Sequence, residues 1–163
     1  MSDEPARASA SAGLMSAGRE TSRLSMVFRY AIAERLGLTV SDLECLDFLA
    51  DAGSATAGQI AARTNLTTGA VTSMLRRLQQ AGWVTADRDP GDRRRVIVTL
   101  RPERATELDR PYQRFAERAG RLVEGYSTEE ITLLIRHHDR LQEMYLAELD
   151  RIRGAGPRDS RAN

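Results

Sequence analysis

The sequence predicts a mainly helical protein of the α+β class, with four helices, one β-hairpin and then two further helices. Three observations predict this class. Apolar residues recur at helical spacing over most of the chain, glycines and capping patterns divide that spacing into short helices, and one stretch of alternating apolar residues follows a Pro-Gly pair. A chain of 163 residues is long enough for one domain with an attached helical element.

The first two helices are separated by glycine. Apolar spacing favours a helix over residues 22–36, which Gly37 ends. The residues Ser41 and Glu44 have the spacing of a capping box, so a second helix is expected to open there and to close at Gly53. Everything before residue 22 is rich in Ser, Ala and Gly, and we expect residues 1–21 to form a disordered tail.

The next two helices are short and close together. Thr56 and Gln59 form another capping pattern, which opens a helix through Arg63. A turn at residues 65–66 follows, and Thr67 or Thr68 caps a fourth helix that ends at Gln80. In that helix Val71, Leu75 and Leu78, flanked by Met74, fall on one side and are expected to pack against Ile60 and Leu46.

The character of the chain then changes. Residues 84–87 and 95–100 have the pattern of two strands joined by a Pro-Gly turn, which predicts a hairpin. Helical spacing returns after Pro102, and Pro111 is expected to kink or divide that segment. Residues 127–130 have capping spacing and open a last helix with a nearly heptad apolar repeat. A polar tail is expected over residues 154–163.

Composition and hydropathy argue against a membrane protein and a secreted protein. The 41% hydrophobic and 29% charged fractions are ordinary for a soluble protein, no apolar run approaches a membrane span, and the N-terminus lacks the pattern of a secretory signal. We therefore expect a cytoplasmic protein with no membrane partner. Residues 63–101 carry eight arginines against three aspartates, whereas residues 102–153 carry nine against eleven acids. Positive charge is thus concentrated in the middle of the chain, as in nucleic-acid-binding proteins.

The order helix, short helix, turn, helix and hairpin is that of a winged helix-turn-helix. The outer side of the fourth helix carries small residues and donors, and residues 66–80 contain no carboxylate. Small residues allow close approach to a major groove, and an arginine such as Arg76 can read guanine. The alternative is an ordinary solvated helix face, although such faces usually mix acids and bases. The arginines at the hairpin tip suit a minor groove, with a solvated charged turn as the alternative.

Here the sequence resembles the MarR (multiple antibiotic resistance regulator) family of transcriptional regulators. The resemblance covers about residues 24–152 and is carried by LTTGAVTSMLRRLQQAGWV (66–84) and RDPGDRRRV (88–96). Two positions depart from the family pattern: Ala86 stands where an arginine is usual, and the segment after the second strand (residues 100–104) differs from the usual Leu-Thr-x-x-Gly.

The resemblance implies a homodimer that binds double-stranded DNA. Residues 22–153 would form the family domain, with residues 38–101 as the winged helix-turn-helix and residues 22–37 and 102–153 as dimerisation helices. It also implies a repressor that a small ligand, often aromatic or phenolic, releases from a pseudo-palindromic operator. The expected DNA-binding residues are Thr67, Thr68, Gly69, Thr72, Ser73, Arg76, Arg77, Arg88, Asp92, Arg93 and Arg94, where Asp92 could instead hold a neighbouring guanidinium or the backbone.

Several single residues have two interpretations. Phe28, Tyr30, Phe48 and Tyr112 could line an effector pocket, although packing in the core or dimer interface is favoured. Adjacent histidines at 137 and 138 point about 100° apart on a helix, so neither metal nor effector binding is favoured over packing. Cys45 could sense oxidants, but nearby acids disfavour its thiolate and core packing is preferred.

Two rival functions remain at this stage. An enzyme is not favoured, because the sequence shows no nucleophile–base pair, metal-ligand set or phosphate-binding loop. We therefore expect no catalytic residues, no metal and no cofactor. A winged-helix module that binds a protein instead of specific DNA is the alternative to the regulator.

Overall fold

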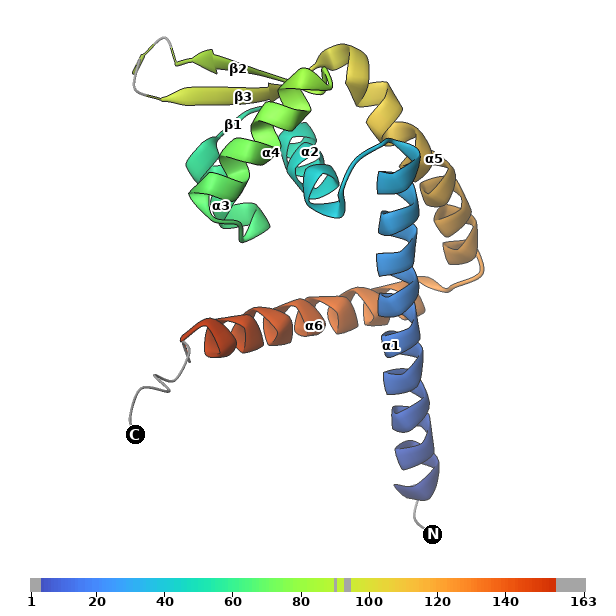
Figure 1. Ribbon diagram of the computed structural model, residues 1–163. Coiled ribbons are helices and arrows are strands. Elements are labelled where there is room, and N and C mark those ends of the chain that lie inside the picture. Colours follow the sequence, from blue (N-terminus) through green and yellow to red (C-terminus); the bar gives the residue numbers. More distant parts are fainter. Residues whose placement is uncertain (1–3, 90, 93–94, 155–163) are drawn as a thin grey trace, which may run out of the picture. The chain divides into compact units, whose positions relative to one another are not determined.

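The computed structural model describes residues 4–89, 91–92 and 95–154 (Figure 1). The chain divides into two compact units, Met1–Gln113 and Arg114–Asn163. The first unit holds the helix-turn-helix, the hairpin and the core. Among the described residues, no helix is long and apolar enough to cross a membrane. The predicted class, mainly helical with a small antiparallel wing sheet, is confirmed.

The first helix is much longer than expected. α1 spans Glu4–Arg35, so the structure corrects the predicted tail for residues 4–21. Residues 4–27 are all exposed, which means that packing within this chain does not hold this part of the helix. Its five alanines between residues 4 and 21 have the highest helix propensity of any residue and favour this helix, although Gly13 and Gly18 lie within it. The prediction put too much weight on the low complexity of the segment.

The next three helices begin at threonines. α2 spans Val40–Ala52, α3 spans Ala57–Thr64 and α4 spans Thr68–Gln80. The predicted caps at Thr56 and Thr67 are confirmed. The predicted cap at Ser41 is wrong, because Thr39 caps α2 and forms the reciprocal pair with Asp42. Both pairs have the same three-residue spacing, so the pattern alone could not choose between them.

The hairpin forms where it was expected. β2 (Val84–Arg88) pairs antiparallel with β3 (Val96–Leu100), with Val84 opposite Leu100 and Arg88 opposite Val96. An additional two-residue strand that the sequence did not predict, β1 (Ala55–Thr56), pairs with the other edge of β3. The sheet order is therefore β1-β3-β2, and β1 ties the segment before α3 to the hairpin.

One apolar core unites the elements of the first unit. Leu46, Ile60, Val71 and Leu78 are almost completely buried in it, as their spacing predicted. Contacts join α4 to both α3 and β2, and α2 to α3 and β3. α4, the second helix of the helix-turn-helix and in this fold the one called the recognition helix, and the hairpin, called the wing, are therefore attached to the same core.

The last two helices differ in how much they bury. α5 spans Pro102–Val123 and runs through Pro111 as one helix, so of the two predicted effects of Pro111, a kink or a division, the division does not occur. Leu108 is the residue of α5 in the core. α6 spans Thr128–Gly154 and buries none of its residues. Its predicted cap is confirmed, since Ser127 Oγ accepts from the Glu130 amide and the Glu130 carboxylate accepts from the Ser127 amide.

Candidate nucleic-acid interface

A tight turn joins the two helices of the helix-turn-helix. Asn65 follows α3 with φ 55°, in the left-handed region that asparagine tolerates better than most residues. The Thr67 hydroxyl oxygen then accepts a hydrogen bond from the Ala70 amide, at 3.3 Å, and so caps α4. These two residues set the direction in which α4 leaves the turn, and Figure 1 shows α4 crossing beside the hairpin.

The outward side of α4 has the composition that the sequence predicted. Val71, Met74, Leu75 and Leu78 are buried, and the rest of the helix is exposed. The exposed side carries Thr68, Gly69, Thr72, Ser73, Arg76, Arg77 and Gln80. With no carboxylate between residues 66 and 80 and the helix N-terminus at one end, this side attracts anions. We call it the acid-free face.

The tip of the hairpin is only partly described. Arg88 and Asp92 are exposed, and the Asp89 amide donates to the Arg95 carbonyl while the Arg95 amide donates to the Asp92 carbonyl. The Asp89 carboxylate also accepts from the Gly91 amide at 2.8 Å. These bonds join Asp89 and Asp92 to Arg95, and Asp89 to Gly91. The predicted contact residues Arg93 and Arg94 lie outside the described residues.

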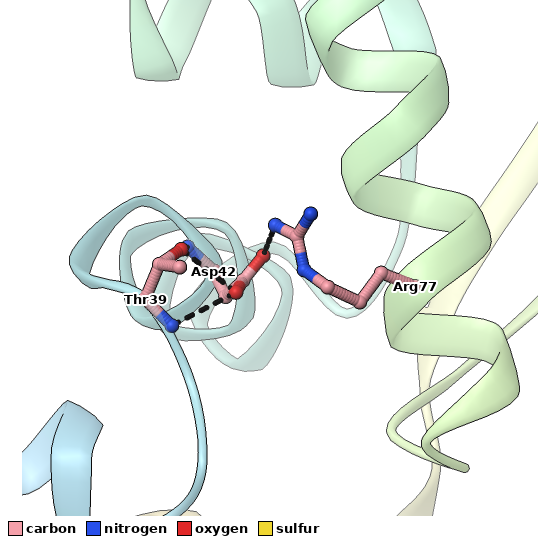
Figure 2. Close-up of polar contacts among 3 residues, drawn as sticks. All are labelled: Thr39, Asp42 and Arg77. Carbon is pink, nitrogen blue, oxygen red and sulfur yellow. Dashed lines mark hydrogen bonds and ion pairs between the residues drawn. The ribbon is translucent and has the colours of Figure 1, made fainter.

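Arg77 has a partner within the chain. Its Nη2 lies 2.6 Å from Oδ1 of Asp42, which is only 2% exposed (Figure 2). The other carboxylate oxygen of Asp42 accepts from the amide and the hydroxyl of Thr39. This ion pair joins the recognition helix to the first turn of α2, whereas the only role predicted for Arg77 from the sequence was contact with DNA.

A second arginine holds the end of α4. Arg104 of α5 donates from Nη2 to the carbonyl of Ala81, the residue that caps α4, at 3.0 Å. Its guanidinium carbon lies 4.6 Å from the centroid of the Trp83 ring, within the range of a cation–π contact. The C-terminal end of the recognition helix is thereby tied to the start of α5.

The four aromatic residues predicted for an effector pocket are not all together. Phe28 and Tyr112 meet edge to face with ring centroids 6.3 Å apart, and Phe48 is half-buried against the core. Tyr30 is 59% exposed and stands two residues from Phe28 on α1, on another side of the helix. The structure thus brings Phe28 and Tyr112 into contact and leaves Tyr30 outward.

Polar groups that the sequence did not single out surround Tyr112. Arg29 Nη1 lies 2.9 Å from Oδ2 of Asp47, and the Tyr112 hydroxyl lies 3.4 Å from the same oxygen. Burial, and then the charge of Asp47, raise the pKa of Tyr112. A cavity of about 410 Å³ lies one helical turn away along α2 and α5, and its lining includes Asp51, Leu108 and Asp109 but none of the four predicted aromatic residues.

The cysteine and the two histidines differ in how far they are buried. Cys45 is completely buried, and burial, reinforced by Asp42 and Glu44, raises the pKa of its thiol to about 12. A protonated, inaccessible thiol supports core packing over redox sensing. His137 is half-buried and His138 is exposed on α6. Among the described residues, no group of three or more His, Cys, Asp or Glu side chains could hold a metal ion.

Some residues of this region were missed because their role depends on tertiary contacts. Four of these residues bond to groups on other helices or at another helix's end: Arg29, Asp42, Asp47 and Arg104. A local sequence pattern cannot predict such long-range pairs. Of these residues, only Asp42 could have been found from the sequence, because Thr39 precedes it with the three-residue spacing of a capping box.

A helix-turn-helix with an acid-free second helix, followed by a hairpin, defines a winged helix-turn-helix DNA-binding domain. Comparison with known proteins agrees. Residues 36–95 match the MarR family. The chain is 34% identical to an uncharacterized HTH-type transcriptional regulator, YcgE of Bacillus subtilis (strain 168), over 138 residues, which cover 83% of this chain and 88% of YcgE.

Solved structures show the same fold. One is a mutant of S. aureus MepR bound to an oligodeoxyribonucleotide, with a TM-score of 0.59 and 20% identity over 81% of this chain and 97% of that one. Another is NadR in complex with 4-hydroxyphenylacetate, with a TM-score of 0.59 and 23% identity over 78% of this chain and 91% of that one.

The chain therefore belongs to the MarR family of helix-turn-helix transcriptional regulators, and it is a DNA-binding regulator and not an enzyme. Regulators of this family bind DNA and dimerise.

Proposed function

We propose that this regulator is a homodimeric repressor which binds a pseudo-palindromic operator and leaves it when a small aromatic ligand binds. The acid-free face of α4 carries the proposal, because a helix with this composition fits a major groove. Two such helices related by a two-fold axis would enter successive major grooves, about 34 Å apart. The family resemblance supports repression.

The proposed contacts with DNA follow from where each residue lies on α4 or on the hairpin. Gly69, Thr72, Ser73 and Arg76 face outward from α4 and are proposed to approach base edges. The N-terminal end of the helix, with Thr67 and Thr68, is proposed to meet a phosphate. Of the wing residues, Arg88, Arg93 and Arg94 would follow the backbone or the minor groove, with Asp92 holding the turn.

Dimerisation is supported by the second unit. α6 leaves a stripe of apolar side chains exposed, among them Leu134, Tyr145, Leu149 and Ile152. Tyr145, Leu149 and Ile152 lie along one side of the helix at spacings of three, four and seven residues, and Leu134 lies on the same side eleven residues, about three turns, before Tyr145. An exposed apolar stripe of this length marks an interaction surface. We propose that a second copy of the chain covers it.

Selection of duplexes from a random library tests the proposed operator binding. The expected result is a two-fold symmetric consensus with half-sites about ten base pairs apart, bound by two protomers. The logarithm of the binding constant should fall linearly with the logarithm of salt concentration, by about 0.9 per phosphate neutralised. If no consensus emerges and the protein instead binds a protein partner tightly, the chain is a winged-helix interaction module.

The effector is proposed to bind beside Tyr112 and Arg29. The aromatic rings of Phe28 and Tyr112, the Arg29 guanidinium and the nearby cavity offer a ring surface, a cation and space. A small phenolic or aromatic acid would match all three, with its carboxylate replacing Asp47 as the partner of Arg29. The same class of ligand occurs in the NadR complex. A ligand shifts the equilibrium between the DNA-binding and the non-binding conformations only by the difference in its affinity for the two. The effector must therefore bind the non-binding conformation better.

Ligand release is tested with 4-hydroxyphenylacetate and a panel of related aromatic acids. At least one should raise the melting temperature and dissociate the selected duplex. Tyr112→Phe removes only the hydroxyl, so it should raise the ligand concentration needed for release about tenfold and leave DNA binding unchanged without ligand. Tyr126→Phe, at an exposed ring of the second unit, is the control. Release by none of the acids, or equal potency on both variants, contradicts this site.

A further inference from the structure

Asp42 is the one buried charged side chain among the described residues, and both of its carboxylate oxygens accept hydrogen bonds. Oδ2 accepts from the Thr39 amide at 2.9 Å and from the Thr39 hydroxyl at 2.7 Å, and Oδ1 accepts from Arg77 at 2.6 Å (Figure 2). The Asp42 amide in turn donates to the Thr39 hydroxyl oxygen at 3.1 Å. This carboxylate is therefore fixed in the first turn of α2 and can act as an anchor.

Arg77 stands at the edge of the acid-free face. It directly precedes buried Leu78 and follows outward-facing Arg76, so it lies between the core side and the outer side of α4. Its side chain is 53% exposed, yet its guanidinium reaches sideways to α2. A bond from the flank of a helix to a fixed anchor resists rotation of that helix about its own axis.

Such rotation would matter for reading DNA. A recognition group works when it is held within about 0.5 Å or 10–20° of its productive geometry. The apolar contacts of Val71 and Leu75 hold α4 against the core, but apolar packing is not directional in the way that a charge-assisted hydrogen bond is. Within the described part of the chain, the Asp42–Arg77 pair is the charge-assisted hydrogen bond that joins α4 to another element beside Arg76.

We propose that Arg77 is a positioning residue for base reading, acting through Asp42, and not one of the phosphate contacts. The pair sets the rotation of α4 so that Arg76 and its neighbours face the bases. This inference rests on the proposed operator binding. It also makes Asp42, an acid outside the acid-free face, a determinant of sequence specificity.

The test exploits a difference in sign. Asp42→Asn removes a negative charge and frees Arg77, so a phosphate role for Arg77 predicts tighter binding to every duplex. A positioning role predicts instead that affinity for the selected duplex falls about tenfold while affinity for a random duplex does not fall. Glu44→Gln changes the net charge equally in the same helix and is the control, because Glu44 is half-buried with no ion pair in the described structure. It should leave the ratio of the two affinities unchanged.

Arg77→Gln provides a second readout that loss of stability does not move. Loss of a phosphate contact lowers the slope of the salt dependence by about 0.9 and weakens both duplexes equally. Loss of positioning leaves the slope on the random duplex unchanged and lowers the affinity ratio. The double variant Asp42→Asn/Arg77→Gln should lose no more than the single variants, because one interaction is removed in each case.

The outcomes separate this inference from the proposed function. If the unaltered protein selects no sequence, the proposed function fails. If it selects one and Asp42→Asn keeps the affinity ratio, or Arg77→Gln reduces the salt slope by about one, the positioning role is wrong. Should Asp42→Asn not fold, as judged by circular dichroism, Arg77→Gln decides alone, since it leaves the capping contacts of Asp42 with Thr39 in place.

Discussion

Replacing Tyr145 and Leu149 with glutamate is expected to convert the dimer to a monomer and to weaken binding to the selected duplex roughly 10²–10⁴-fold. Both side chains are largely exposed in the chain itself, so the substitutions should not disturb its fold. In the proposed dimer they would place two charges in a desolvated apolar contact. A monomer then loses the gain that comes from binding two half-sites at once.

Sedimentation equilibrium and a gel-shift titration check this expectation together. The variant should have the mass of one chain, 18.1 kDa, and the unaltered protein twice that mass. A matched control, Thr132→Glu/Ala147→Glu, adds the same two charges on other sides of α6 and should remain dimeric. A dimeric Tyr145→Glu/Leu149→Glu variant with unchanged affinity would show that α6 does not form the interface.

Local signals in the sequence were sufficient for most of the fold. The turn at Asn65, the caps at Thr56 and Thr67 and the hairpin all depend on neighbouring residues, and the structure confirms them. Errors arose where local signals were ambiguous. Two equally spaced capping pairs competed at the start of α2, and an alanine-rich segment that could be helix or coil was assigned to a tail. β1 could not be predicted, because two residues are too few to show the alternating pattern of a strand and β1 is defined by its pairing with β3.

In the candidate DNA-binding site, too, some features could be predicted from local sequence and others could not. The acid-free face of α4 follows from helical spacing, so the exposure of Gly69, Ser73 and Arg76 could be predicted. The partner of Arg77 could not, because Asp42 lies 35 residues away and the two are brought together by the core that α2 and α4 share. The Arg29–Asp47–Tyr112 cluster is hidden for the same reason, since it joins three helices.

Truncation of Arg76 is the most direct measurement of whether the acid-free face of α4 reads DNA. Arg76→Ala removes a guanidinium that can form a bidentate contact with a guanine, which is worth roughly 1–3 kcal/mol. The selected duplex should therefore bind about 5- to 150-fold more weakly, while a random duplex should lose far less. Arg110→Ala, at an exposed arginine of α5, is the matched control and should change neither affinity.

The ratio of the two affinities, measured at one fixed salt concentration, is the quantity to compare between Arg76→Ala and the unaltered protein. If the ratio falls by the expected factor and the preference at one base pair is relaxed, Arg76 contacts a base. An equal loss on both duplexes, or no loss on either, would contradict the claim that this face of α4 reads the operator.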